Sequence, residues 1–322
     1  MALAVLSAPA AAQPSPVDGT KSDTDLNVHV LDVGQGNCVI VECPGGLPIL
    51  NDCGSSSATG AMTSEEVHRY VSAVLAQYKR EAEPLVVIAS HPHADHVNLI
   101  SDPTYGVKAN LVAGLYFSET LDKYSAPFQA WARNIRIKAG FNRPDYRIPF
   151  LNCGRAKVDI VAVNANPGTE SANTDSVVLR IRYANLSVYL TGDGDGVTQQ
   201  AVLQNTGDAK ADIILALHHG ADTHGSNDAT WVAATEPQAV FFSAGYHNRY
   251  RHPRCTTVDN YAGSPRLAAA QSHSFSCGAD RTATWDTRTT TKMIYSTAAS
   301  GTLRLTIGPK GEVTLRCNER AC

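Results

Sequence analysis

Three histidines and one aspartate lie within six residues in the segment HPHADH, as His91, His93, Asp95 and His96. Neutral imidazole and carboxylate groups are natural ligands of zinc and similar divalent cations. In a tight loop the first two histidines can face one point while the Asp-His pair faces another, which suits two metal ions lying close together. A chance cluster of surface histidines is the alternative, and the density of ligand groups argues against it. The segment therefore predicts a metal site.

Three further segments place candidate residues where a predicted strand ends. Asp52 lies in LNDCG, where its carboxylate could orient a ligand histidine. Asp193 lies in the glycine-rich turn LTGDGDG, where a carboxylate is well suited to bridge two metals, and His218 and His219 lie in LALHHG. Each signal is weak alone, because Gly-Asp-Gly is usually a turn and a strand-end histidine is usually structural. Their shared position at strand ends predicts a single site.

The segment SAGYHNRYRHPR follows another predicted strand and is rich in arginine and histidine. Guanidinium groups can form paired hydrogen bonds with phosphate oxygens, so Arg249 and Arg251 are candidate phosphate ligands. The alternative is a solvated loop whose arginines pair with surface acids. The segment therefore favours a phosphate ester as substrate only if these arginines are not paired with surface acids.

The apolar pattern predicts strands in blocks with helices between them. Residues 27–33 alternate and are β-branched, and residues 85–90 form a short apolar run that ends directly at His91. Residues 63–79 begin Thr-Ser-Glu-Glu and carry apolar side chains at helical spacing, which predicts a capped amphipathic helix. Residues 124–138 are also predicted to be helical. Mixed sheets covered by helices on their outer faces would satisfy this order.

A single domain is predicted over residues 27–322, because the chain of 322 residues suffices for one large core. Residues 1–12 are apolar and alanine-rich with small residues at Ala10 and Ala12, which is typical of a signal-peptide remnant. Residues 13–26 are predicted to form a polar linker. Within the domain we expect a disulfide-held flap over residues 255–288 and a C-terminal β-meander over residues 289–322.

Eight cysteines, an even number without CxxC spacing, indicate disulfides and therefore a secreted or periplasmic protein. Spacing does not fix their connectivity, and the near pairs are the simplest expectation: Cys255 with Cys277, Cys317 with Cys322, and Cys43 with Cys53. The net charge of −3 provides no bulk positive field for nucleic acid or anionic membranes. No segment is long and apolar enough to suggest a membrane span, and no protein partner is evident.

The ordered set DVGQG, NDCG, HPHADH, LTGD, HHG and NRYRHP resembles the metallo-β-lactamase superfamily. Within it, the set is most similar to the ComEC-like hydrolase domain of DNA-uptake channel proteins and to its secreted stand-alone relatives. The resemblance covers residues 27–253. It implies an α/β fold, the four-layer αββα sandwich, in which two mixed β-sheets lie face to face between helices and the site lies at one edge.

The resemblance also implies a role for each candidate residue. The first cation would be held by His91 and His93, and the second by Asp95, His96 and His219, with His218 as the alternate and Asp193 as the bridge. A metal-bound hydroxide, oriented by Asp95, would attack phosphorus or a carbonyl carbon. His252 occupies the position of the branch's late histidine and is a candidate general acid.

Two departures from the superfamily pattern affect the first cation and the DVGQG segment. Many members supply a third histidine from the segment equivalent to residues 164–179, which here contains no histidine. Asn173, Asp175 or water could fill that position. Two zinc ions are expected, with manganese or magnesium possible at the His91/His93 site because it has fewer nitrogen ligands. Asn37 stands where the branch commonly has aspartate.

Three functions are compatible with these residues. The favoured one is a secreted metal-dependent phosphodiesterase or nuclease acting on a small-molecule or nucleic-acid phosphodiester. A metallohydrolase of lactones, esters, thioesters or β-lactams would use the same hydroxide, and an exported binding module without catalysis would keep only the fold. The chain shows no interleaved aromatic and basic residues of the kind that stack single-stranded nucleic acid, so a small phosphodiester is as well supported as a polymer.

Overall fold

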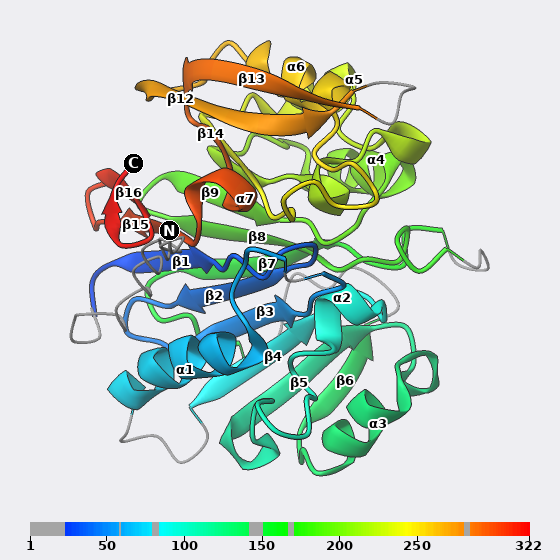
Figure 1. Ribbon diagram of the computed structural model, residues 1–322. Coiled ribbons are helices and arrows are strands. Elements are labelled where there is room, and N and C mark those ends of the chain that lie inside the picture. Colours follow the sequence, from blue (N-terminus) through cyan, green and yellow to red (C-terminus); the bar gives the residue numbers. More distant parts are fainter. Residues whose placement is uncertain (1–22, 58, 79–83, 142–150, 167–170, 280–283) are drawn as a thin grey trace, which may run out of the picture.

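The strands assemble into two large mixed sheets that lie face to face (Figure 1). The computed structural model describes residues 23–57, 59–78, 84–141, 151–166, 171–279 and 284–322. The predicted signal-peptide remnant and most of the predicted linker lie outside the described residues, so both stay predictions. The linker's last residue, Leu26, already belongs to the first strand.

The first sheet has nine strands in the order β17-β16-β15-β1-β2-β3-β4-β5-β6. Its strands are β1 (Leu26–Val30), β2 (Cys38–Glu42), β3 (Ile49–Cys53), β4 (Leu85–Ala89), β5 (Val112–Ser118), β6 (Lys138–Phe141), β15 (Leu303–Ile307), β16 (Val313–Cys317) and β17 (Arg320–Ala321). Pairing is parallel from β3 to β6 and antiparallel elsewhere.

The second sheet has six strands in the order β14-β11-β10-β9-β8-β7. Its strands are β7 (Lys157–Ala162), β8 (Val178–Tyr183), β9 (Leu186–Leu190), β10 (Ile213–Leu215), β11 (Ala239–Phe242) and β14 (Ile294–Ser296). A separate hairpin consists of β12 (Ala269–Gly278) and β13 (Trp285–Lys292).

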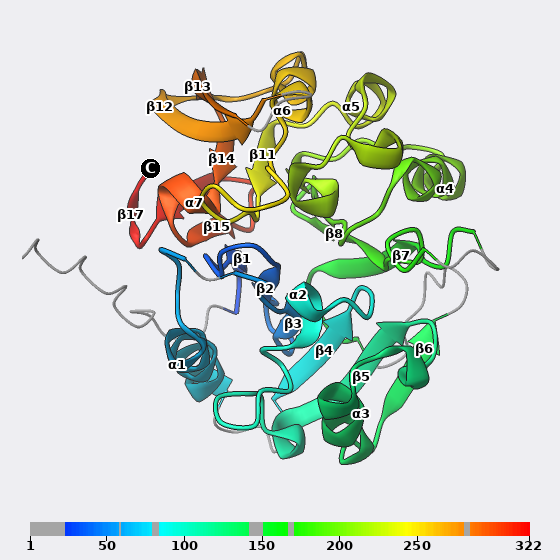
Figure 2. The same cartoon turned by 45° about the vertical axis from the view of Figure 1, so that its right-hand side comes forward.

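Helices cover the outer face of each sheet (Figure 2). They are α1 (Ser64–Leu75), α2 (Ala94–Val97), α3 (Ala126–Arg133), α4 (Gly196–Thr206), α5 (Ala229–Thr235), α6 (Cys255–Ala262) and α7 (Thr297–Ser300). The predicted capping box is present, because Thr63 and Glu66 cap α1 reciprocally. The helix expected over residues 124–138 is shorter, since residues 138–141 pair with β5. None of the described helices is long and apolar enough to cross a membrane.

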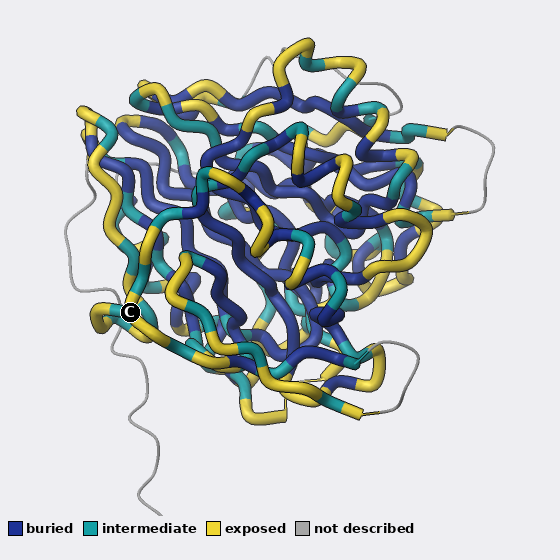
Figure 3. Tube along the Cα trace, turned by 90° about the horizontal axis from the view of Figure 1, so that it is seen from above, coloured by how far each residue is buried: buried dark blue, intermediate teal, exposed yellow. Residues whose placement is uncertain are grey.

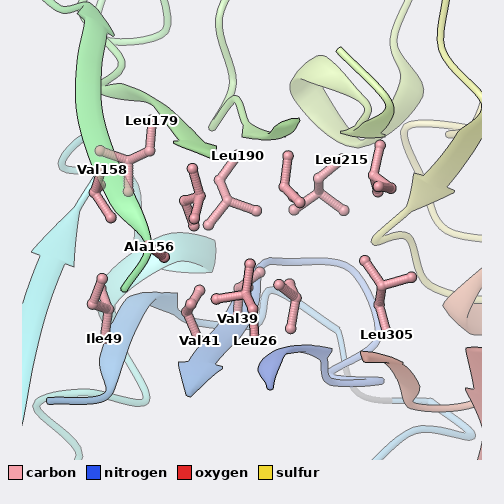
Figure 4. Close-up of a cluster of buried hydrophobic side chains, with 14 of the residues drawn as sticks. Leu26, Val39, Val41, Ile49, Ala156, Val158, Leu179, Leu190, Leu215 and Leu305 are labelled. Carbon is pink, nitrogen blue, oxygen red and sulfur yellow. The ribbon is translucent and has the colours of Figure 1, made fainter. Parts of the chain in front are cut away.

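The β2 strand shows why the fold needs four layers. Val39 and Val41 pack into the core between the two sheets, whereas Cys38 and Ile40 pack into the core beneath the helices on the outer face. Figure 4 shows the side chains of Val39 and Val41 on the side of the first sheet that faces Leu190 in the second sheet. Buried backbone dominates the centre and exposed backbone the rim (Figure 3). Apolar side chains on both faces of the strand therefore require cover on both sides.

The expected C-terminal meander over residues 289–322 is wrong in its first strand. Ile294–Ser296 pairs in parallel with β11 in the second sheet, whereas β15 to β17 extend the first sheet as antiparallel neighbours. Ile294 packs into the outer core and Tyr295 into the core between the sheets. The strand is thus buried on both faces, which the exposed edge of a meander would not provide.

Four disulfides join all eight cysteines, and two of the three expected pairs, Cys255–Cys277 and Cys317–Cys322, are present. The expected Cys43–Cys53 pair is wrong. Cys53 lies directly opposite Cys38 in the antiparallel β2–β3 register and bonds to it, and Cys43 bonds instead to Cys153. Strand register, which spacing does not reveal, decides the partner.

Asp32 carries a buried carboxyl group in the loop after β1, and we expect Asp32→Asn to stabilise the protein at alkaline pH. Burial raises the pKa of Asp32 to about 7, and the hydrogen bond from Gly34 N–H only partly opposes this. Because the folded pKa exceeds the unfolded value, stability is lost as pH rises from about 4 to about 7. The variant should gain about 2 kcal/mol at pH 8 and nothing at pH 4.

Thermal unfolding at the two pH values measures this difference. Asp286→Asn, at an exposed position of β13, is the matched control and should show no pH-dependent gain. Equal effects of Asp32→Asn at both pH values would contradict a raised carboxyl pKa.

Candidate metal centre

The candidate residues lie where strands of both sheets end. Asp52 is in β3, His91 follows β4, and Asp193 follows β9. His218 and His219 follow β10, which pairs in parallel with both β9 and β11. Since the carboxyl ends of parallel strands share one edge, the sandwich brings these residues together at one place.

Two compact groups of potential ligands form there. In each group the ligand atoms all lie within 4.8 Å of one another: His91, His93 and Asp193 form one group, and Asp95, His96 and His219 form the other. The structure thus gathers the six residues that the resemblance implies as ligands, and it places Asp193, the expected bridge, in the first group. Their roles as metal ligands stay predictions.

The carboxylate of Asp193 divides four imidazoles between its two oxygens. Oδ1 lies 3.0 Å from Nε2 of His96 and 3.2 Å from Nε2 of His219. Oδ2 lies 3.7 Å from Nε2 of His91 and 3.6 Å from Nε2 of His218. A carboxylate placed in this way can face two cations, one on each oxygen.

The ring nitrogens fit cations at both places. Nε2 of His91 and Nδ1 of His93 are 3.0 Å apart, and Nε2 of His96 and Nε2 of His219 are 3.3 Å apart. Two nitrogens that each lie about 2.0–2.1 Å from one tetrahedral zinc ion are themselves about 3.3 Å apart. Asp193 Oδ1 is buried with no hydrogen-bond partner of good geometry, despite its short distance to His96. Lone pairs that converge in this way suit a shared cation.

Hydrogen bonds on the far side of the rings fix their orientation. Nδ1 of His96 lies 2.8 Å from Oδ2 of Asp52, and Nδ1 of His219 lies 2.7 Å from the carbonyl oxygen of Ser243. Ser90 Oγ donates to Asp52 and lies 3.0 Å from Nδ1 of His91. With Nδ1 so engaged, Nε2 is left to face the cluster.

Asn37 explains one departure from the superfamily pattern. Its amide Nδ2 donates a 3.0 Å hydrogen bond to Oδ2 of Asp52, the oxygen that also contacts His96. An amide at this position supports the carboxylate that orients the imidazole, whereas a second carboxylate would repel it. Asn37 therefore acts as a hydrogen-bond donor here.

Two consecutive histidines adopt the left-handed backbone conformation. His218 has φ 51° and ψ 47°, and His219 has φ 55° and ψ 19°. This conformation costs non-glycine residues roughly 1–2 kcal/mol each, and such strain gathers at functional sites. Here it brings both imidazoles to Asp193, on opposite oxygens.

Two side chains of the cluster are held in the charge state that binds a cation. Burial lowers the pKa of His91 well below its usual value, and neighbouring His96 lowers it further. Burial opposes ionisation of Asp193, but the imidazoles of His219 and His96 outweigh it and hold its pKa well below the usual range. Asp193 is therefore a carboxylate and His91 a neutral imidazole, the forms in which these side chains bind metals.

Asn173 and Asp175, the candidate replacements for the missing third histidine, differ in position. Asn173 Nδ2 lies 3.4 Å from Nε2 of His218, at the border of the cluster. Asp175 forms no described contact with the clustered imidazoles, and burial together with Glu119 raises its pKa to about 6. The structure thus brings Asn173 and His218 to the first group and leaves Asp175 outside it.

His252 lies against the cluster, with its ring centroid 5.3 Å from that of His218. Burial lowers its pKa well below the usual value, and His218 lowers it further. A neutral imidazole can donate a hydrogen bond but is a poor source of a proton at neutral pH. The lowered pKa therefore argues against the predicted general-acid role, which stays a prediction.

The two candidate phosphate ligands are at the surface beside His252. Arg249 places its guanidinium 4.6 Å from the centre of the Tyr250 ring. Neither Arg249 nor Arg251 forms an ion pair with an acid in the described parts of the chain, whereas Arg254 pairs with Asp222 at 3.5 Å. The alternative of a loop neutralised by surface acids thus holds for Arg254 only.

Residues 31–100, which include Asp52 and the HPHADH segment, match the family described as the metallo-beta-lactamase superfamily. In these residues the chain is similar to the metallo-beta-lactamase superfamily. Its two mixed sheets between helices form the αββα sandwich that the resemblance predicted.

Two curated proteins are similar to this chain and support the ComEC-like resemblance at low identity. ComE operon protein 3 of Bacillus subtilis (strain 168) is 24% identical over 239 residues, which are 70% of this chain and 29% of that protein. Recombination protein 2 of Haemophilus influenzae is 25% identical over 233 residues, 72% of this chain and 26% of that protein. The chain thus spans less than a third of the length of either relative.

Solved structures similar to this chain include two with low sequence identity. The metallo-beta-lactamase fold protein YhfI of Bacillus subtilis is 14% identical with a TM-score of 0.43, covering 85% of this chain and 98% of that one. A diphosphatase of the PhnP family is 11% identical with a TM-score of 0.38, and the match covers 68% of this chain and 87% of the diphosphatase.

Sequence reasoning missed two supporting residues. Ser90 contacts Asp52, His91 and His96, and its place directly before HPHADH was the available signal. Ser243 contributes a backbone carbonyl to His219, which no side-chain pattern could reveal.

Proposed function

We propose that this chain is a secreted metal-dependent phosphodiesterase. The observation that carries the proposal is the carboxylate of Asp193, which has two imidazoles at each oxygen. The nearby loop adds Arg249 and Arg251, which form no ion pair with an acid among the described residues. Export is supported by the four disulfides, which persist in oxidising compartments.

Two divalent cations fit the residues present. His91, His93 and Asp193 would hold the first, and Asp95, His96, His219 and Asp193 the second. His218 approaches the same Asp193 oxygen as His91, so it is the nearest imidazole available to replace the third histidine absent from residues 164–179. When bound, such cations lower the pKa of water to about 7 and polarise a phosphoryl oxygen.

Residues around the cluster would accept the proton of the attacking water and bind the phosphate oxygens. Asp95 lies 3.8 Å from Nε2 of His219 and is partly exposed, so its carboxylate can accept a proton from an attacking water. Arg249 and Arg251 can each donate hydrogen bonds to non-bridging phosphate oxygens. Cationic donors at this edge favour a phosphate ester over a neutral lactone or ester, which has no anionic oxygens for them to bind.

Arg251→Ala and Arg249→Ala should each lower kcat/KM for a phosphodiester by about 10- to 100-fold, because a charge-assisted hydrogen bond is lost. Metal content should stay unchanged. The measurement compares a dinucleotide, a lactone and a β-lactam with the zinc- and manganese-loaded protein. Arg316→Ala, at an exposed arginine of β16, is the matched control and should have no effect.

Two results would count against the proposal. Fewer than one divalent cation per purified chain would remove its basis. Faster turnover of the lactone or β-lactam than of the phosphodiester would assign the site to carbonyl substrates.

A further inference from the structure

A cavity of about 200 Å³ lies next to the metal centre, between the β12–β13 hairpin and the loop that follows β11. It is lined by Gly245, Tyr246, His247, His252, Pro253, Ser274, Phe275, Ser276, Trp285, Thr287, Ala298 and Ala299. The Cys255–Cys277 disulfide ties the hairpin to the start of α6 beside it. The predicted flap segment therefore supplies much of one wall.

His252 connects this cavity to the metal centre. It lines the cavity, and its ring centroid lies 5.3 Å from that of His218 and 6.5 Å from that of His219. Its Nδ1 is buried without a hydrogen-bond partner. A buried polar atom without a partner costs about 1–3 kcal/mol, so the site is suited to a ligand that supplies one. A molecule reacting at the cations can therefore extend past His252 into the cavity.

Planar rings form one side of the cavity. Tyr246 and His247 stack with centroids 4.0 Å apart and planes 10° apart, and His247 stacks on Trp285 at 4.7 Å and 19°. Tyr246 is 56% exposed, which is unusual for a large aromatic side chain held in a stack. These rings come from segments almost 40 residues apart, so only the fold brings them together.

Among the described residues, the lining carries no aspartate, glutamate, lysine or arginine. Aromatic faces and the hydroxyls of Ser276 and Thr287 suit an uncharged planar group with polar edges. Arg249 and Arg251, by contrast, lie in the adjoining loop and suit anionic oxygens. The molecule that matches both parts has a neutral heterocycle at one end and a phosphate at the other.

We propose that this cavity is a nucleobase subsite, which binds the base next to the scissile phosphate of a nucleotide phosphodiester. The inference rests on the proposed function, because it names the substrate class of the same site. Stacking against the rings holds the base, and His252 contacts the substrate between the base and the phosphate. No bond is made or broken in the subsite.

Trp285 reports on binding directly, because the other tryptophans, Trp131 and Trp231, lie in α3 and α5. Adenosine 5′-monophosphate should quench its fluorescence, and ribose 5-phosphate, which has the phosphate but no base, should bind at least about 10-fold more weakly. Trp285→Ala should weaken adenosine 5′-monophosphate binding about 10-fold by calorimetry, and Trp285→Phe should retain it within a few-fold. Trp131→Phe is the matched control.

Equal affinity for the two phosphates, or unchanged binding in Trp285→Ala, would overturn the subsite. The far-ultraviolet circular dichroism and melting of Trp285→Phe show whether the hairpin stays folded. A dinucleotide should also be hydrolysed about 10-fold faster than an analogue with one base replaced by hydrogen. Equal hydrolysis of both refutes the subsite and leaves the phosphodiesterase standing. Base-dependent binding without any hydrolysis supports the subsite and refutes the phosphodiesterase.

Discussion

Asp193→Asn is expected to abolish tight binding of both cations and to lower phosphodiesterase activity on the order of 1,000-fold. The carboxylate faces imidazoles through both oxygens, so neutralising it weakens two sites at once. An amide also places a donor nitrogen against ring nitrogens that would otherwise point lone pairs at a cation. Metal content by mass spectrometry and initial rates on a dinucleotide measure the two losses.

Asp175→Asn is the matched control for this substitution. Asp175 is a buried aspartate near the same edge, and it makes no described contact with the clustered imidazoles. The control should retain both cations and most of the activity. Retention of both cations by Asp193→Asn, or their loss in Asp175→Asn, would reverse the roles assigned to these two carboxylates.

The cluster depends on strain as well as on ligand type. His218 and His219 both need a left-handed backbone to reach opposite oxygens of Asp193. Gly220, which follows them at φ 85°, contacts Phe242 and Pro253 so closely that a Cβ atom there would lie 2.7 Å from each. The HHG segment is thus a compact turn in which two strained residues and one glycine position two imidazoles. This explains why the three residues occur together in the sequence as a motif.

Much of the site could be predicted because its signals are local. HPHADH is contiguous, and Asp52, Asp193 and His219 each directly follow or end an apolar run whose strand character is evident in the sequence. Parallel strands bring such positions to a common edge without further information. The capping box of α1 is local in the same sense, since Thr63 and Glu66 are three residues apart.

The parts that could not be predicted depend on packing between distant segments. Cys43 bonds to Cys153 because the two sheets face each other there, and Ile294–Ser296 joins the second sheet because both of its faces find apolar cover. Trp285 reaches His247 only through the hairpin that Cys277 anchors to α6. Neither the spacing of residues nor their periodicity in the sequence indicates contacts between such distant segments.

Removal of the Cys43–Cys153 disulfide by Cys43→Ala with Cys153→Ala should cause the largest stability loss of any single disulfide. The bond closes a loop of 110 residues, which corresponds to about 5 kcal/mol of unfolded-state entropy. Both cysteines are also buried in the core between the two sheets, so the bond joins the layers that hold the candidate metal centre. We expect the melting temperature to fall by roughly 5–10 °C.

Cys317→Ala with Cys322→Ala is the matched control, because it removes the same two sulfurs from a loop of only 5 residues at the sheet edge. The chain-entropy relation gives about 2 kcal/mol for this loop, hence a fall of roughly 2–4 °C. Calorimetric unfolding of both variants in the metal-free state compares the two directly. Equal losses would show that loop length does not govern the contribution of Cys43–Cys153, and that packing of the half-cystines between the sheets does.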